Sequence, residues 1–482
     1  MTGELNIFVG NNAGYSNTHG FRNIILGDSA GFLNISGANN VFLGVKAGYN
    51  SNANNNIFIG DSTGYYNTSG KYNVFMGTLA GKSNTEGTSN VFIGDGAGEY
   101  VTTGGRNIFI GDYAGHENTT GNNNILMGVA TGRRNEGNFN ILMGNWAGYY
   151  NTTGSENIFL GSYSGAFNST GAYNIYIGML AGNKSDTASR NVFIGNNSGE
   201  NNYGGDRNVF LGNWSGHENT IGESNVFIGA SSGEKNTTGN SNVLIGLDAG
   251  FNNTTGNDNI FLGTSAGYMS KTAHNNVFIG NNSGYWDSSG EENVFIGNQS
   301  GHNTTTGYQN TMIGGVTGWQ NTEGFRNTFL GIHSGNSNTE GSENVFIGAA
   351  SGAENQTGSY NVYLGSAAGE SSNGNNNVFI GPSAGYSSKG DNNVFLGPSA
   401  GSSEQGSNRL YIENSEADST NALIYGEFDH DILILNAKVT VRDLVNITPG
   451  SAPDSPSEGD IYYDAALHKL MVYDGADWQA CW

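Results

Sequence analysis

The sequence is poor in cysteine, proline and basic residues, and each shortage excludes a class of protein. A single cysteine among 482 residues, Cys481, excludes an intrachain disulfide framework, so stability must come from backbone hydrogen bonds and apolar burial. Only 18 Lys and Arg stand against 41 Asp and Glu, and the net charge of −23 argues against nucleic acid or anionic membrane as a partner. No apolar run has transmembrane length. With 5 prolines, the 78 glycines follow no G-x-y triplet, which excludes collagen.

The chain instead repeats one phrase of 16 or 17 residues, 24 times between Asn6 and Gly406. Each unit reads Asn, three apolar residues, Gly, two variable residues, Ala, Ser or Thr, Gly, and a polar return. We number positions within a unit from its Asn, so position 3 is the middle apolar residue. A period of this kind is typical of a quasi-one-dimensional repeat structure in which each unit touches only its neighbours.

The constant positions predict the shape of one unit. The apolar triplet is β-branched and aromatic and is bounded by turn residues, which indicates a strand and not a helix. Gly at positions 5 and 9 suits corners that need a positive φ or close backbone approach, and the Asn column can form an amide ladder between turns. We therefore predict an all-β fold: a β-solenoid or β-roll of 24 turns, on the order of 115 Å long at about 4.8 Å per turn.

Alternation along the strand places positions 2 and 4 on one side and position 3 on the other, yet all three are apolar. A lone solenoid buries only its inward face, so the other face predicts a partner along the whole rod, most economically an intertwined or side-by-side homotrimer. The sequence does not say whether the position-3 column fills the private core or the seam between chains. The candidate residues for core or trimer packing are Phe8, Phe42, Phe58, Phe92, Phe109, Phe159, Phe193, Phe227, Phe261, Phe295, Phe346 and Phe395.

The pattern ends near residue 407, and the rest of the chain differs in composition. We predict a repeat shaft over residues 1–407, a β transition segment over 408–448, a Pro-rich linker over 449–458, and a C-terminal β-hairpin module over 459–482. Aromatic residues of this last module are the candidates for a receptor-contacting tip: Tyr462, Tyr463, Tyr473 and Trp478.

The recurring Asn-Val-Phe-Ile-Gly phrase, as in residues 90–94, resembles the β-roll head repeats of trimeric autotransporter adhesins, whose shorter units carry Asn-Ser-Val-Ala-Ile-Gly. This resemblance covers residues 6–407 and departs in period and in the Phe at position 3. The segments Gly459–Asp464 and Tyr473–Trp478 resemble short modules at the ends of phage-type or contractile-injection-type tail fibres. Because neither a coiled-coil stalk nor an anchor accompanies the repeats, and residues 1–5 carry no secretory signal, we expect a fibre on a larger particle or surface, outside the cell or on a virion or injection particle.

Nothing in the sequence departs from the repeat as catalysis would require, and the eight His lack metal-ligand spacing. We therefore expect a structural, non-enzymatic fibre without cofactor or metal, which mediates attachment or adhesion through a cell-surface receptor or glycan. One alternative is a surface adhesin that binds glycans with the array itself. A less favoured alternative is an ice-binding solenoid, against which the irregular placing of Thr speaks. Aromatic residues of the array are the candidates for glycan contact: Trp146, Tyr149, Trp214, Tyr285, Trp286 and Trp319.

Overall fold

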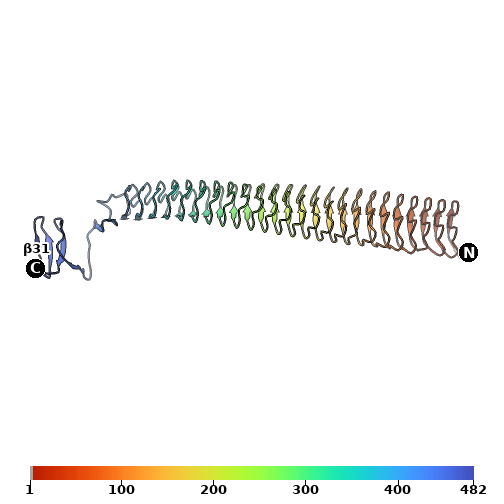
Figure 1. Cartoon of the computed structure of the whole chain (residues 1–482), viewed down its shortest axis with the longest axis horizontal. Helices are drawn as coiled ribbons and strands as arrows, with labels where there is room; N and C mark the ends of the chain where they lie inside the picture. The colour runs from red at the N-terminus through yellow and green to blue at the C-terminus, as the bar shows by residue number, and fades with distance from the viewer. Residues whose placement is uncertain (1–3, 482) are drawn as a thin grey trace.

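The computed structural model describes residues 4–481 and confirms the predicted all-β solenoid (Figure 1). Residues 1–3 and 482, at the outer ends of the predicted shaft and terminal module, lie outside the described residues. Within residues 4–481 every regular element is a strand, and no helix capable of crossing a membrane is found there.

Each repeat forms one turn of the solenoid and contributes one three-residue strand, made by positions 2 to 4. Successive strands pair in parallel and in register, so that Phe193 lies on Phe210 and Val192 on Val209. The strands are β1 (Ile7–Val9), β2 (Ile24–Leu26), β3 (Val41–Leu43), β4 (Ile57–Ile59), β5 (Val74–Met76), β6 (Val91–Ile93), β7 (Ile108–Ile110), β8 (Ile125–Met127), β9 (Ile141–Met143), β10 (Ile158–Leu160), β11 (Ile175–Ile177), β12 (Val192–Ile194), β13 (Val209–Leu211), β14 (Val226–Ile228), β15 (Val243–Ile245), β16 (Ile260–Leu262), β17 (Val277–Ile279), β18 (Val294–Ile296), β19 (Thr311–Ile313), β20 (Thr328–Leu330), β21 (Val345–Ile347), β22 (Val362–Leu364), β23 (Val378–Ile380) and β24 (Val394–Leu396).

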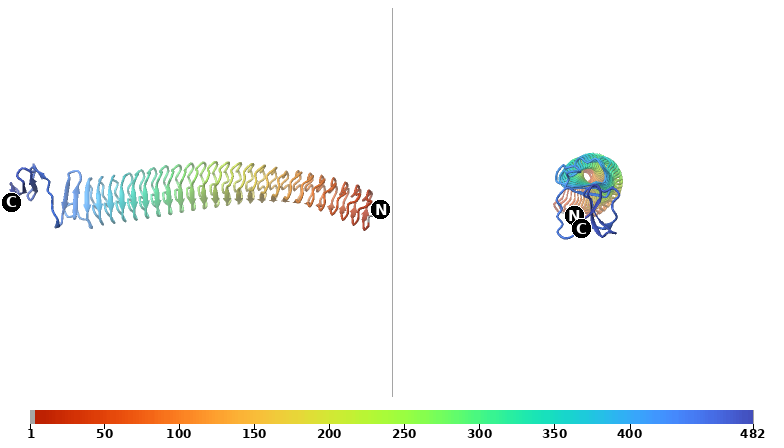
Figure 2. Two further views of the ribbon diagram at one scale, coloured as in Figure 1. Left: turned by 90° about the horizontal axis from the view of Figure 1, so that it is seen from below. Right: turned by 90° about the vertical axis from the view of Figure 1, so that its left-hand side faces the viewer.

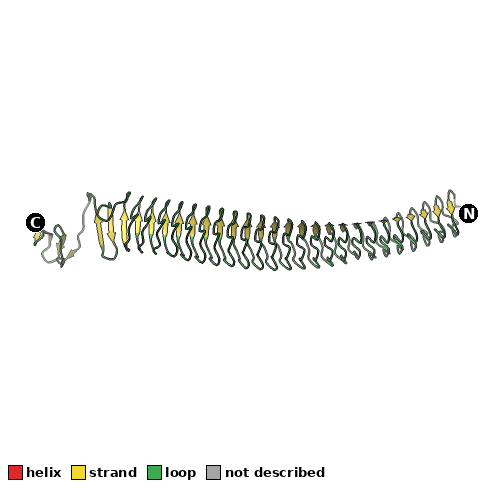
Figure 3. Ribbon diagram, turned by 90° about the horizontal axis from the view of Figure 1, so that it is seen from above, coloured by secondary structure: helices red, strands yellow, loops and turns green. Residues whose placement is uncertain are grey.

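All of these strands lie along one wall of the rod, and the other side of each turn is made of tight turns (Figure 3). We call the wall made by β1 to β24 the strand wall. The rod curves gently along its length and is thin in cross-section (Figure 2). A thin section leaves room for a single column of large side chains in the middle.

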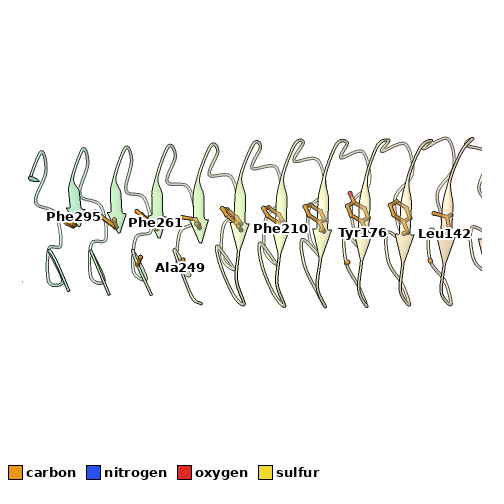
Figure 4. Packing of buried hydrophobic residues seen from close by; sticks show 14 of the residues in the cluster. Leu142, Tyr176, Phe210, Ala249, Phe261 and Phe295 are labelled. Carbon is orange, nitrogen blue, oxygen red and sulfur yellow. The ribbon is translucent and has the colours of Figure 1, made fainter. Parts of the chain in front are cut away.

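The middle residue of each strand fills that space. Phe210, Phe227 and Phe261 are fully buried, and the rings of Phe193, Phe210 and Phe227 stack at 4.7 Å between centroids with their planes within 8° of parallel (Figure 4). Stacking of this kind is favourable beyond the burial of area alone. The core of the rod is therefore one aromatic column, interrupted by Leu, Ile or Met in a few turns.

The two constant glycines are explained by close approach, as predicted. Gly314 at position 5 has φ +143°, and a Cβ there would lie 2.5 Å from the carbonyl oxygen of Gly331 in the next turn. Gly233 at position 9 has φ +57°, and a Cβ there would lie 2.5 Å from the ring of Phe227. Position 9 thus lies across the core from the strand wall, and its missing side chain makes room for the aromatic ring.

The predicted Asn ladder is also confirmed. The backbone N–H of Asn208 donates to Oδ1 of Asn191 in the previous repeat (2.8 Å), and the Asn208 Nδ2 donates to the carbonyl of Gly222 near the end of its own repeat (2.8 Å). Both side chains are fully buried, and they form the hydrogen bonds that water would otherwise make with backbone groups at the start of the strand. The first position of the repeat is therefore fixed by hydrogen bonding and not by chemistry at the surface.

Three more strands extend the sheet of the rod after the repeats, and a small second sheet of four strands follows them. Strand β25 (Arg409–Ile412) pairs in parallel with β24 and continues the ladder, after which β26 (Ile424–Glu427) and β27 (Ile432–Leu435) pair in antiparallel fashion. The second sheet holds β28 (Pro449–Gly450), β29 (Ile461–Asp464), β30 (Lys469–Tyr473) and β31 (Trp478–Ala480). The antiparallel strands close the C-terminal end of the solenoid, and an extended segment leads from there to the second sheet (Figure 1).

Candidate functional site

The Phe column predicted for core or trimer packing belongs to the core of the single chain. Of the twelve residues named from the sequence, eleven are fully buried, and Phe8 in the first turn is 38% exposed because no turn covers it among the described residues. The inward ring faces the bare Cα of position 9, as Phe227 does with Gly233. The question left open by the sequence is settled: Phe fills the private core, and positions 2 and 4 face outwards.

Those outward side chains turn the strand wall into a continuous apolar surface. In β12 and β20 the position-4 residues Ile194 and Leu330 are 40% and 42% exposed, and in β4 and β16 the position-2 residues Ile57 and Ile260 are each 38% exposed. Since the strands are in register, these side chains form two parallel columns of Ile, Val, Leu and Met along the rod, interrupted only by Thr at position 2 of β19 and β20. An apolar surface of this length is typical of an interaction site.

The wall across the core carries aromatic ladders. Tyr15, Phe32, Tyr49 and Tyr65, all at position 10, stack with centroids 4.9 to 5.1 Å apart. A second ladder runs from Phe251 through Tyr268, Tyr285 and His302 to Trp319. Burial raises the pKa of the Tyr65 and Tyr268 hydroxyls. Within these ladders the ring faces are covered by the neighbouring turns, so the rings present mainly edges and hydroxyls.

The six aromatic candidates for glycan contact do not form one site. Trp146, Trp214 and Trp286 are 39%, 43% and 46% exposed and lie far apart along the rod. Trp214 and Trp286 each lie against one neighbouring ring, and Trp146 lies against two. Tyr285 and Trp319 are members of the second ladder.

Tyr149 corrects the prediction most clearly, because it is only 7% exposed. Trp146 stacks on its ring at 4.4 Å, Tyr150 meets it edge-on at 4.5 Å, and Arg133 lies 5.8 Å from its centre while donating to its hydroxyl. A ligand has no access to either face of this ring.

In the terminal module the structure brings three of the four tip candidates together. Tyr462 and Tyr473 both contact Trp478, with ring centroids 4.6 and 5.3 Å away. Tyr463 points to the other side of the sheet, where it lines a shallow hollow with Ile447. The Tyr462 hydroxyl donates to Asp464 (2.8 Å), and this bond raises the pKa of that hydroxyl.

The acidic residues near the C-terminal end of the rod form ion pairs. Carboxylate and imidazole atoms of Glu427, Asp429 and His430 lie within 4.8 Å of one another. The Arg409 guanidinium lies 3.1 Å from Asp429 and 3.8 Å from Glu427, and supplies the positive charge that this cluster needs. The turn carboxylate of Asp474 accepts the backbone N–H groups of residues 476 and 477, which makes it a turn cap.

The segment that follows β26 exposes apolar side chains on both of its faces. In β27 the residues Ile432 to Leu435 are 40% to 62% exposed, and beyond it Val439, Val441 and Leu444 are 57%, 50% and 74% exposed. This segment makes one antiparallel pairing, with β26, and leaves its other edge free among residues 4–481. The sequence predicted a β segment over 408–448 but not its exposure.

A second amide ladder and one side-chain pairing escaped the sequence reasoning. At position 12 most turns carry a buried Asn, and Asn236 Nδ2 donates to Asn219 Oδ1 at 2.6 Å. Where position 3 is Tyr, position 12 of the same turn is Ser: the Tyr363 hydroxyl donates to Ser372 Oγ at 3.1 Å, and Tyr176 is matched by Ser185. The sequence shows this pairing as two turns in which positions 3 and 12 both differ from their usual Phe and Asn.

Comparisons of the chain with protein-family models, with curated proteins and with solved structures found no match.

Proposed function

We propose that the protein is a structural fibre, a homotrimer whose repeat shaft holds a C-terminal module at a distance and which mediates attachment to a cell-surface receptor or glycan. It would act outside the cell or on a larger particle such as a virion or injection particle. The observation that carries the proposal is the exposed apolar strand wall, because no other property of the rod accounts for two aliphatic columns over its full length.

The size of this wall supports an interface between chains. At about 4.8 Å per turn and about 10 Å across a three-residue strand, 24 turns offer ~1,100 Å² on each chain. A stable protein–protein interface needs about 800 Å² from each partner. Three copies with their strand walls towards a common axis would cover the aliphatic columns and leave the aromatic wall facing solvent.

The exposed segment after β26 supports the same assembly. Its apolar side chains on both faces, and the free edge of β27, suit a strand exchanged or shared between copies. It lies between the rod and the terminal module, where three chains would have to meet. The aromatic cluster of Tyr462, Tyr473 and Trp478 then gives the module a compact face for a receptor or for a particle.

The molecular mass in solution tests the proposal. Mass photometry should give three times the chain mass of 50.6 kDa. The double variant Ile245→Lys and Ile279→Lys places two charges on the strand wall, at half-buried positions that a single chain tolerates, and should reduce the mass to that of one chain. The matched control carries the same charges on the exposed return, as Thr238→Lys and Thr255→Lys, and should remain trimeric.

Two outcomes would contradict the trimer. One is a folded wild-type protein of 50.6 kDa, and the other is a lysine variant on the strand wall that keeps the full assembly mass. Circular dichroism of each variant shows whether the solenoid is retained, so that loss of assembly is distinguished from unfolding.

A further inference from the structure

The repeats act as internal controls for one another, because every turn meets the same steric demands. Positions 11 and 13 both point outwards at the edge of the aromatic wall, on either side of the inward position 12. Across the array, position 11 is mostly small, polar or charged, and position 13 is Thr in half of the turns. A departure from these columns that packing does not require therefore marks a local function.

Positions 11 and 13 both depart from their usual residue types in one region of the rod, between turns 9 and 12. Tyr150 and Phe167 are the only two aromatic residues that follow each other directly at position 11, and Tyr203 is the only aromatic residue at position 13. Phe167 and Tyr203 are 50% and 48% exposed. Since neither ring is in the core, the fold gives no reason for either residue.

The unusual residues at these two positions line a single groove of about 550 Å³ that runs along the rod. One side is made by Tyr150, Phe167 and Lys184 at position 11. The other side is made by Thr152, Ser169, Asp186 and Tyr203 at position 13. The volume falls in the range of small-ligand sites, which are mostly apolar with a few placed polar groups.

The aromatic side of the groove is held in place by its neighbours. Tyr150 and Phe167 stack with centroids 5.3 Å apart and planes at 22°. Arg134 lies 5.3 Å from the centre of the Tyr150 ring, and its Nε donates to Glu117 at 2.7 Å. Two adjacent rings on successive turns thus form a wall about two turns long, and both rings line the groove.

The polar groups are arranged along the same groove. Lys184 Nζ donates to Asn201 Oδ1 at 2.8 Å, which directs the ammonium along the position-11 column. Asp186 accepts from the Ser169 hydroxyl through Oδ1, and its other oxygen stays available as an acceptor. The groove therefore offers an apolar ring surface, a cationic donor, an anionic acceptor and the Thr152 and Tyr203 hydroxyls within one elongated space.

We propose that this groove binds a neutral oligosaccharide that lies along the rod. The apolar C–H faces of its rings pack on the exposed edges of the stacked Tyr150 and Phe167 rings and on Tyr203, and its hydroxyls bond with Asp186 and Lys184. Acidic glycans are disfavoured by the carboxylate of Asp186 and by the net charge of −23. A purely apolar ligand would leave the charged groups of the groove without partners.

This proposal rests on the proposed attachment role and names a ligand class for it. All residues of the site belong to one chain, so the site does not require the trimer. Its failure and that of the trimer can therefore be told apart. The groove belongs to the wall opposite the strand wall, so it stays open in the proposed trimer as well as in a monomer.

The test compares the full-length protein with variants on an array of printed neutral hexose oligosaccharides and of sialylated and sulfated glycans. The double variant Phe167→Ser and Tyr203→Thr installs residues that other turns carry at the same positions, such as Ser83 and Thr220. The control Tyr66→Ser removes a position-11 ring that is 48% exposed and has no aromatic residue at position 11 of the adjoining turns. Mass photometry and circular dichroism accompany each variant.

We expect the wild type and Tyr66→Ser to bind neutral oligosaccharides alike, and the double variant to bind at least about tenfold more weakly with unchanged mass and spectrum. The proposal is overturned if the wild type binds no neutral oligosaccharide, if it binds acidic glycans alone, or if the double variant binds as well as the wild type. A monomeric wild type that binds neutral oligosaccharides would refute the trimer and leave this site standing.

Discussion

Asp287 places a carboxyl group inside the rod, in the position-12 column that is mostly Asn. The side chain is fully buried. Oδ1 accepts the backbone N–H of Gly290 at 2.6 Å, whereas Oδ2 has no partner among the described residues. The hydroxyls above and below it, Ser270 Oγ and Thr304 Oγ1, are likewise unpaired within residues 4–481. Burial raises the pKa of Asp287 to about 8, against the lowering effect of the backbone hydrogen bonds.

The pH dependence follows from the direction of this shift. In the unfolded chain Asp287 ionises near its ordinary pKa of 3.8, whereas in the rod it keeps its proton up to about pH 8. Between these values the folded state binds the additional proton, so the free energy of unfolding is highest below pH 4 and falls as pH rises to about 8. Each pH unit in this window costs at most ~1.4 kcal/mol, which makes the total loss on the order of a few kcal/mol after local relaxation.

The variant Asp287→Asn restores the residue that the column usually carries and removes the ionisable group. We expect it to match the wild type at pH 4 and to be more stable by a few kcal/mol at pH 8. Thermal melts followed by circular dichroism give the difference for the whole rod. Hydrogen exchange of peptides from residues 277–310 shows whether the gain is confined to the three adjoining turns, as expected for a repeat array.

Two further variants make the comparison specific to the buried site. Asn236→Asp introduces a carboxyl into the intact part of the same ladder and should create the same pH dependence where none existed. Asp258→Asn changes an exposed acid and should leave the pH dependence of stability unchanged. If Asp287→Asn alters stability equally at pH 4 and pH 8, the carboxyl is already ionised in the rod and the reasoning from burial is refuted.

Further predictions concern the turns and the core. Gly314→Ala should destabilise the rod by about 3 kcal/mol or more, because it combines a strained φ with a backbone clash. The adjacent Gly315→Ala should be neutral or stabilising by about 0.5 kcal/mol, since its Cβ would meet no atom closer than 3.9 Å. Equal melting temperatures of the two variants would contradict the account of position 5. Phe227→Ala should cost about 3–5 kcal/mol in thermal or denaturant unfolding, and a loss below 1 kcal/mol would show that the aromatic column is not the core. Ser372→Asn should destabilise the rod by about 1–3 kcal/mol, because the amide competes for the space of the Tyr363 hydroxyl. In a double-mutant cycle, adding Tyr363→Phe should recover most of this loss of stability. Additive losses would contradict the pairing of the two residues.

Much of the fold follows from the sequence because the repeat imposes one steric solution in every turn. The strands, the glycine corners and the first Asn ladder were predicted from positions that do not vary. The direction of Phe was not, since alternation separates position 3 from positions 2 and 4 without saying which side is inside. The constant Gly at position 9 held the missing information, because only a residue without Cβ leaves room for a ring across a thin core.

The candidate sites were harder to predict, because exposure depends on what the next turn contributes. Tyr149 and Trp146 were named together as glycan contacts, yet one is buried under the other. The groove at Phe167 and Tyr203 escaped notice because these residues lie 36 positions apart in the chain and meet only when the turns are stacked. Reading each position as a column across turns would have revealed that departure.

The hydrogen bonds between turns also determine how the rod carries load. The strands pair from turn to turn along the length of the rod, so a pull between its two ends acts on these bonds in series. The same force passes through every turn, and the array can resist no more than its weakest turn does. A turn with unpaired buried groups, such as that of Asp287, is where we expect such a fibre to extend first, and its length would then increase by one uncoiled repeat at a time.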